Sequence, residues 1–98
     1  MPHPVPFAPS PPLVTLDAPN ARGQLSVQPA GWWCSGTLHI IKMGQPETIP
    51  VALCWFTDEP GGPRYQDITQ GVVIWPFSDG SCIVQTPGHM TLGSWSQP

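Results

Sequence analysis

The feature that most constrains the fold of this chain is the alternation of apolar and polar residues across residues 22–43. Within residues 23–28, Leu25 and Val27 alternate with polar side chains, which is the period of two typical of a half-buried β-strand. Residues 32–43 predict a second, longer strand, with Leu38 and Ile40 on the same face as Cys34. A Pro-Ala-Gly sequence between the two segments is typical of a turn. The stretch therefore predicts a β-hairpin.

The rest of the chain repeats this pattern in short apolar segments that are separated by turn residues. We expect these further strands at residues 13–16, 49–56, 64–69, 72–75, 81–86 and 90–95. Turns recur every 8–12 residues and no segment has helical periodicity, so the sequence predicts an all-β fold, a small antiparallel β-sandwich or jelly roll. Pro50 cannot donate to a β-ladder, which favours a sheet edge at that point.

Residues 1–12 differ from the rest because they hold six of the fifteen prolines. Proline excludes both a helix and an interior strand, so we expect an extended Pro-rich arm that spans on the order of 35 Å at about 3.1 Å per residue. The sequence thus divides into an arm (residues 1–12) and a β-sandwich domain (residues 13–98). Two interpretations of the arm stay open: a tail without consequence, or a segment that lies on a neighbouring subunit through Val5 and Phe7.

Charged residues make up only 9 % of the chain, with three basic and six acidic side chains. Nucleic-acid binding requires clustered Lys and Arg, so that class is excluded. A chain with so little charge and 40 % hydrophobic residues favours burial of part of its surface by copies of itself or by a partner. The alternative is that uncharged polar residues suffice for solubility. The sequence contains neither a membrane-spanning apolar run nor the basic segment of a signal peptide, and we expect no membrane association.

The sequence offers no set of residues for catalysis. Cys34, Cys54 and Cys82 lie in predicted strands and are expected to be buried free thiols, since no zinc-binding spacing is present. His39 alternates with apolar residues and is expected at a rim or an interface. The acidic pair Asp58 and Glu59 falls in a turn-rich loop, where ordinary solvated carboxylates are expected. We therefore predict a protein without catalytic residues, metal site or cofactor.

Five tryptophans exceed what the core of a small domain readily holds. Tryptophan is enriched at protein interfaces, which favours subunit packing as the explanation. Stacking on sugars is the alternative, although sugar sites usually surround their aromatic platform with polar and charged groups that are scarce here. The candidate interface residues are Val5, Phe7, Trp32, Trp33, Trp55, Trp75 and Trp95.

Residues 21–95 resemble the small β-sandwich virion proteins of tailed bacteriophages. The shared features are a strand at residues 24–28, Gly-Trp-Trp at residues 31–33, Ser-Gly-Thr-Leu at residues 35–38, a turn-rich segment at residues 59–63 and a strand at residues 68–72. The chain departs from this pattern in its Pro-rich arm and its scarcity of charge. The resemblance implies a capsid decoration (cement) protein, or a head-fibre or tail module.

Proteins of this kind do no chemistry and bind other virion subunits, often as trimers. The resemblance therefore implies a homotrimer, synthesised in the host cytoplasm and located in the virion, that binds the major capsid protein or other virion subunits. Many weak contacts made together would stabilise the shell. Two further functions stay open from the sequence: a carbohydrate-binding module, and a small phage-encoded inhibitor that binds a host protein.

Overall fold

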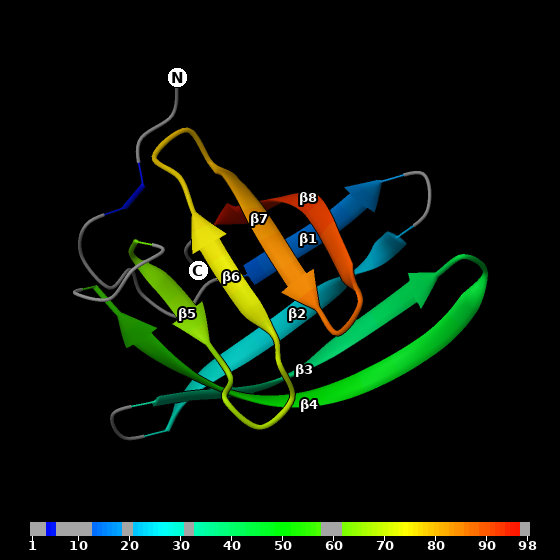
Figure 1. The fold of residues 1–98 in the computed structure, drawn as a ribbon, viewed down its shortest axis with the longest axis horizontal. Helices are drawn as coiled ribbons and strands as arrows, with labels where there is room; N and C mark the ends of the chain where they lie inside the picture. The colour runs from blue at the N-terminus through cyan, green and yellow to red at the C-terminus, as the bar shows by residue number, and fades with distance from the viewer. Residues whose placement is uncertain (1–3, 6–12, 19–20, 31–32, 58–61, 97–98) are drawn as a thin grey trace.

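The structure, a computed structural model, describes residues 4–5, 13–18, 21–30, 33–57 and 62–96 (Figure 1). Among these residues, no helix is long and apolar enough to cross a membrane. The described residues form eight β-strands: β1 (Leu13–Ala18), β2 (Ala21–Ala30), β3 (Trp33–Lys42), β4 (Gln45–Phe56), β5 (Arg64–Gln66), β6 (Val73–Pro76), β7 (Ser81–Thr86) and β8 (His89–Ser96).

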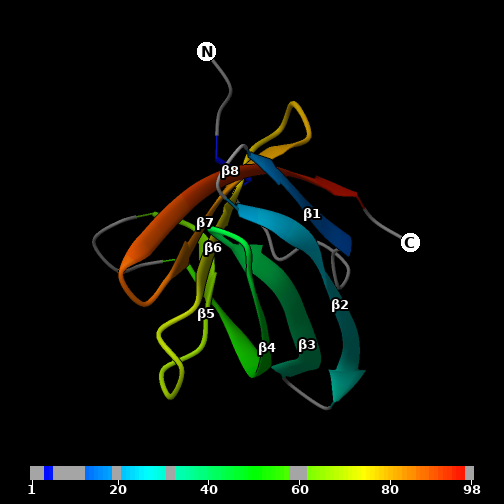
Figure 2. The ribbon, with the colours of Figure 1, turned by 90° about the vertical axis from the view of Figure 1, so that its right-hand side faces the viewer.

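The eight strands close into a single antiparallel barrel. Each strand pairs with the next one along the chain, and β1 also pairs with β8, where Val14 lies opposite Trp95 and Leu16 opposite Gly93. Figure 2 shows the strands around a common interior. The all-β class is confirmed, but the predicted β-sandwich or jelly roll is wrong. Alternation and turn spacing locate strands, whereas the barrel depends on the pairing of the first strand with the last.

The barrel interior is a hydrophobic core to which every strand contributes alternate residues. Leu25 of β2 pairs with Leu38 of β3, which in turn pairs with Ile49 of β4, and all three side chains are buried. On the other side of the interior, Ile74 of β6 lies opposite Val84 of β7. Side chains therefore fill the barrel from both sides, and the predicted inward face of β3 is confirmed.

Glycines at inward-facing positions allow neighbouring strands to approach closely. A Cβ atom at Gly93 of β8 would lie 2.6 Å from the carbonyl oxygen of Thr15 in β1. At Gly36 of β3, a Cβ atom would collide with the carbonyl oxygen of Ser26 in β2. Gly93 thus permits the β1–β8 pairing that closes the barrel.

The predicted hairpin of residues 22–43 is observed as the paired strands β2 and β3. Pro29 pairs with Cys34 and Ala30 with Trp33, so the ladder continues through two of the three predicted turn residues. The remaining turn residue, Gly31, lies outside the described residues.

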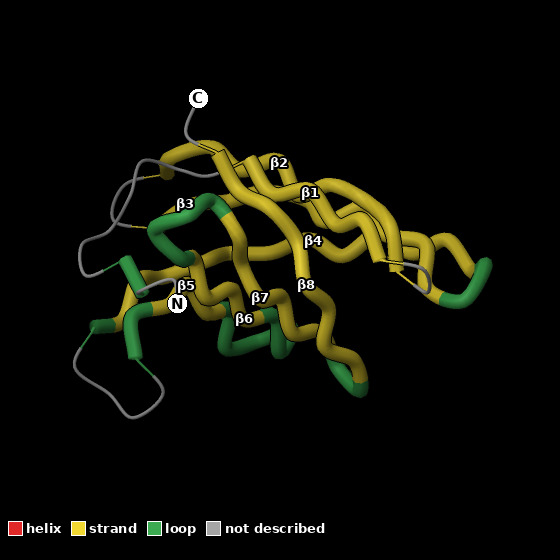
Figure 3. The backbone as a smooth tube through the Cα atoms, turned by 90° about the horizontal axis from the view of Figure 1, so that it is seen from above, coloured by secondary structure: helices red, strands yellow, loops and turns green. Residues whose placement is uncertain are grey.

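The two ends of the long strand β4 pair with different neighbouring strands. Strand β3 pairs with residues 45–53 of β4, whereas the short strand β5 pairs with residues 54–56. Pro50 lies in the half of β4 that has a partner on one side, in agreement with the predicted edge. Figures 1 and 3 show the β3–β4 turn at the far end of this long hairpin.

Asp67 fastens the β5–β6 loop to β4 at the point where the sheet divides. Its Oδ2 atom accepts a hydrogen bond from the Ala52 amide at 2.7 Å. Its Oδ1 atom accepts three more, from the amide and hydroxyl of Thr69, both at 2.7 Å, and from the Gln70 amide at 3.0 Å. The predicted strand at residues 64–69 therefore ends at Gln66, because the Asp67 side chain organises a loop instead.

The charge on Asp67 is maintained although its residue is only 2 % exposed. Burial by itself raises the pKa of a carboxyl group, but hydrogen bonds to the ionised form lower it. For Asp67 the hydrogen bonds from Thr69, Ala52 and Gln70 outweigh burial, and its pKa lies below the ordinary value. The ionised carboxylate is therefore part of the folded structure.

Of the predicted arm, the structure describes Pro4 and Val5, which lie against the barrel of the same chain. Pro4 forms an antiparallel bridge with Phe77, and the Val5 amide donates to the Pro76 carbonyl oxygen at 3.2 Å. The contact lies at the end of β6, beyond the two residues of β6 that pair with β5.

Candidate interaction surface

A row of apolar side chains crosses the outer surface of three neighbouring strands. Trp75 of β6 lies opposite Ile83 of β7, and Ile83 lies opposite Leu92 of β8. Residues on either side of Ile83 and Leu92 point inward: Cys82, Val84 and Thr91 are all buried. The row therefore lies on the outside of the barrel.

This outer surface is exposed on β8, half-buried at Trp75 and Ile83, and formed by strands that carry no charge. Leu92 is 70 % exposed and Met90, two residues earlier on the same face of β8, is 61 % exposed. Strands β6, β7 and β8 contain no Asp, Glu, Lys or Arg. Exposed apolar side chains that lie next to one another on an uncharged wall are typical of a protein-binding surface. We call Trp75, Ile83, Met90 and Leu92 the β6–β8 face.

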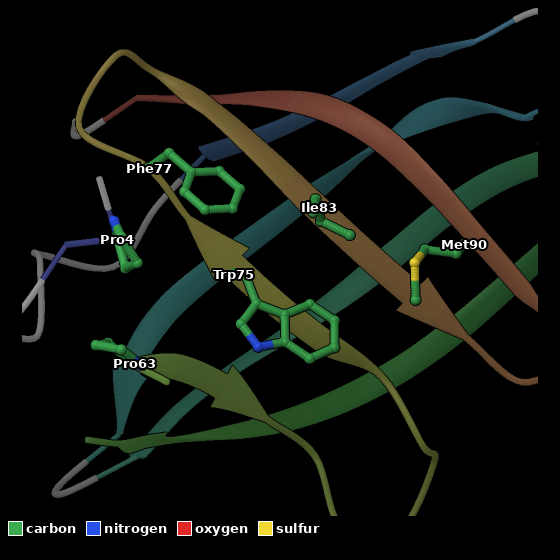
Figure 4. A pocket seen from close by; sticks show the side chains of 6 residues that line it. All are labelled: Pro4, Pro63, Trp75, Phe77, Ile83 and Met90. Carbon is green, nitrogen blue, oxygen red and sulfur yellow. The ribbon is translucent and has the colours of Figure 1, made fainter. Parts of the chain in front are cut away.

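A groove of about 310 Å³ lies along one side of the β6–β8 face (Figure 4). In Figure 4 the Trp75 ring lies between Pro4 and Phe77 at one end of the groove and Met90 at the other. The described side chains that line the groove are all apolar: Pro4, Pro63, Trp75, Phe77, Ile83 and Met90. A groove whose described lining is apolar and uncharged is suited to binding an apolar segment rather than to chemistry.

The predicted interface tryptophans are divided between the interior and the surface. Trp55 and Trp95 pack against the core, and the Trp55 ring meets the Tyr65 ring edge-on at 4.8 Å between centroids. The Trp95 indole donates from Nε1 to the Phe77 carbonyl oxygen at 2.8 Å. Both residues are thus partly buried against the core, and their assignment to an interface stays a prediction.

The remaining predicted interface residues have different locations. Trp75 lies in the groove, and Trp33 is 37 % exposed on β3. Val5 lies half-buried beside Pro76. Phe7 and Trp32 fall outside the described residues. The structure thus brings Trp75 and the start of the arm together, and it leaves Trp33 apart from them.

Sequence reasoning missed Ile83, Met90 and Leu92. In β8 the apolar residues Met90 and Leu92 alternate with Thr91 and Gly93, and this pattern ordinarily places the apolar residues inside. The structure has the reverse arrangement. A signal was present in β7, where Ile83 is apolar although both of its neighbours, Cys82 and Val84, already supply the inward face.

A second exposed apolar group lies at the β3–β4 turn. Ile41 and Met43 are both exposed there, and Met43 has a positive φ of 51°. Lys42 and Glu47 form an ion pair at 3.0 Å across the same hairpin. Because this group is accompanied by charged residues, it is a weaker candidate for an interface core than the β6–β8 face.

The polar candidates of the sequence do not converge. Among the described residues, no three His, Cys, Asp or Glu side chains could hold a metal ion together. His39 is exposed on the barrel wall, where its Nδ1 atom lies 3.4 Å from the Thr48 hydroxyl. Asp58 and Glu59 lie outside the described residues. The described cysteines are free: Cys82 is buried as predicted, whereas Cys34 and Cys54 are half-buried.

The inner surface of the β7–β8 hairpin contains several buried polar atoms. Within the described structure, Thr86 Oγ1, Thr91 Oγ1 and His89 Nε2 have no hydrogen-bond partner. Buried groups of this kind are usually satisfied by ordered water. Strands β7 and β8 thus place these polar atoms inside the barrel and apolar side chains on its outer surface. Most strands have apolar side chains inside and polar side chains outside.

Comparisons with protein-family models, with curated proteins and with solved structures found no match for this chain.

Proposed function

We propose that this chain is a non-enzymatic structural protein that assembles with other protein subunits through the β6–β8 face. The observation that carries the proposal is the row formed by Trp75, Ile83 and Leu92 on three strands without charge. A face of this kind loses unfavourable contact with water when a partner covers it. The partners are copies of this chain, with a trimer favoured, and subunits of a larger assembly.

Among structural assemblies we propose a tailed-phage virion, with the chain as a capsid decoration protein that binds and stabilises the shell. The resemblance to phage virion modules implied a β-sandwich, and the barrel removes that part of its support. Low charge, a Pro-rich N-terminal sequence and an exposed apolar face remain as support, since a decoration protein acts by covering and bridging other subunits.

Carbohydrate binding and inhibition of a host protein are less well supported. A sugar-binding platform needs exposed aromatic rings with polar groups around them. Trp55 and Trp95 pack into the core, and the groove around Trp75 is lined by apolar side chains. The excess of tryptophan that suggested sugar binding is thus accounted for in part by the barrel interior.

The proposal is tested by sedimenting the purified chain with isolated capsid shells of the virus that encodes it. Wild-type protein should pellet with the shells at a fixed ratio to the capsid subunit. Leu92→Asp should remain in the supernatant, because a charge on the face would be buried without a partner when the shell covers it. Ser94→Asp is the matched control, since it places the same charge on the same face of β8 at an exposed polar residue, and it should pellet. Wild-type protein that does not pellet would refute the virion assignment.

A further inference from the structure

We propose that the groove beside the β6–β8 face binds the proline-rich N-terminal arm of a second copy of this chain. This inference rests on the proposed assembly function and names the segment by which copies join. The groove is formed by Pro4, Pro63, Trp75, Phe77, Ile83 and Met90.

The first support is the chemistry of the groove. Aromatic-lined apolar grooves bind polyproline segments, because proline rings pack on aromatic faces and the pre-set backbone loses little entropy on binding. Trp75 and Phe77 supply the aromatic surface here, and Met90 supplies a flexible side chain that adapts to its neighbours. Proline has no amide hydrogen, so the apolar side chains described along the groove would leave few of its groups unsatisfied.

The second support is that one end of the groove already holds a proline of the arm. Pro4 bridges to Phe77, and the Val5 amide donates to the Pro76 carbonyl oxygen at 3.2 Å. Strand β5 pairs only with residues 73–74 of β6, and the residues that follow pair instead with Pro4 and Val5 of the arm. The contact shows which chemistry and which backbone direction this end of the groove accepts.

The third support is the open part of the groove and the sequence of the arm. With Pro4 in place, the groove retains about 310 Å³ that extends to Met90, which is 61 % exposed. Two Pro-x-x-Pro sequences, residues 6–9 and 9–12, lie in the arm of every copy. Copies therefore carry both the ligand and the groove. A head-to-tail contact of this kind closes into a ring when its rotation allows, which suits the proposed trimer.

The test uses the full-length chain and a fluorescently labelled peptide of residues 6–12, which contains both Pro-x-x-Pro sequences. Fluorescence anisotropy should rise to saturation at chain concentrations below about 1 mM. A peptide with every proline replaced by alanine should bind at least about tenfold more weakly. Met90→Asp, a change at an exposed groove residue, should weaken binding of the native peptide by a similar factor. Leu92→Asp lies two residues away outside the groove and should bind the peptide within about twofold of wild type.

Equal binding of the two peptides, or an equal effect of the two variants, would overturn the inference. The mass of each sample, measured by light scattering, separates this failure from that of the proposed function. If the peptide does not bind while wild-type protein is an oligomer that Leu92→Asp disrupts, the assembly function stands and the groove proposal is wrong. If the peptide binds while the wild-type chain is a monomer, copies of the chain do not assemble. The proposal that the arm of a second copy occupies the groove is then refuted as well.

Discussion

Replacing Asp67 by Asn should destabilise the barrel far more than its position in a surface loop suggests. The carboxylate accepts four hydrogen bonds, and its residue is 2 % exposed. A hydrogen bond to a charged group contributes about 1.5–3 kcal/mol net. With Asn at this position, the side-chain oxygen could still accept the hydrogen bonds from Thr69 and Gln70. The side-chain NH₂ group would then face the Ala52 amide, which is also a donor, and that hydrogen bond would be lost. Removing the charge also recovers its desolvation cost, so we expect a loss of about 3 kcal/mol in the free energy of unfolding.

Urea unfolding measures this loss. With a slope of about 1–3 kcal/mol per M, the midpoint of Asp67→Asn should fall by about 1–3 M, with the slope unchanged. Asp79→Asn is the matched control. Asp79 accepts the amide and hydroxyl of Ser81 at 2.9 and 2.6 Å in the same local pattern, but it is exposed, so water replaces the lost contacts. Its midpoint should stay close to that of wild type. Equal midpoints for the two variants would refute the claim that Asp67 fastens the β5–β6 loop to β4.

Three further predictions concern acid stability, a buried thiol and barrel closure. The pKa of Asp67 is lower in the folded state than its ordinary value of 3.8, so its contribution to stability should be complete above pH 3.8 and should be lost as the pH falls below that value. The melting temperature, measured from pH 6 to pH 2, should therefore fall more steeply for the wild type than for Asp67→Asn. Burial raises the pKa of the Cys82 thiol to about 12, so this thiol should be unreactive at pH 8. In a chain with Cys34→Ser and Cys54→Ser, Cys82 should react with Ellman's reagent only after denaturant is added. Prompt labelling of the folded chain would contradict the burial of Cys82. Gly93→Ala should lower the free energy of unfolding, measured in urea, by about 1–3 kcal/mol, because the added Cβ would lie 2.6 Å from the Thr15 carbonyl oxygen. Gly44→Asn is the control and should be tolerated, because Gly44 has a φ of +82°, which Asn can adopt, and no atom lies near its added Cβ.

The strands could be predicted from the sequence because each carries its own local signal. Leu25 and Val27 alternate with polar residues, and the turns contain Pro and Gly, so β2 and β3 were found within a few residues. The closure of the sheet could not be predicted in this way. It depends on the pairing of Val14 with Trp95, residues that lie at opposite ends of the chain and show no shared pattern.

The candidate surface was predicted only in part, for a related reason. Trp75 and Val5 were expected at an interface from their apolar character, and both lie beside the groove. Met90 and Leu92 were missed because alternation ordinarily places the larger apolar residues inside, whereas β8 has the reverse arrangement. That choice depends on the neighbours: Thr91 and Gly93 fit the interior beside Leu16 and Val84, so the larger side chains of β8 point outward.

Association of copies through the β6–β8 face is measured by the mass of the purified protein in solution. Light scattering at two concentrations should give a mass of two or more chains for the wild type, with a closed trimer favoured. Leu92→Asp should lower that mass to one chain, while Ser94→Asp should leave it unchanged. A wild-type monomer at both concentrations would refute association of copies through this face.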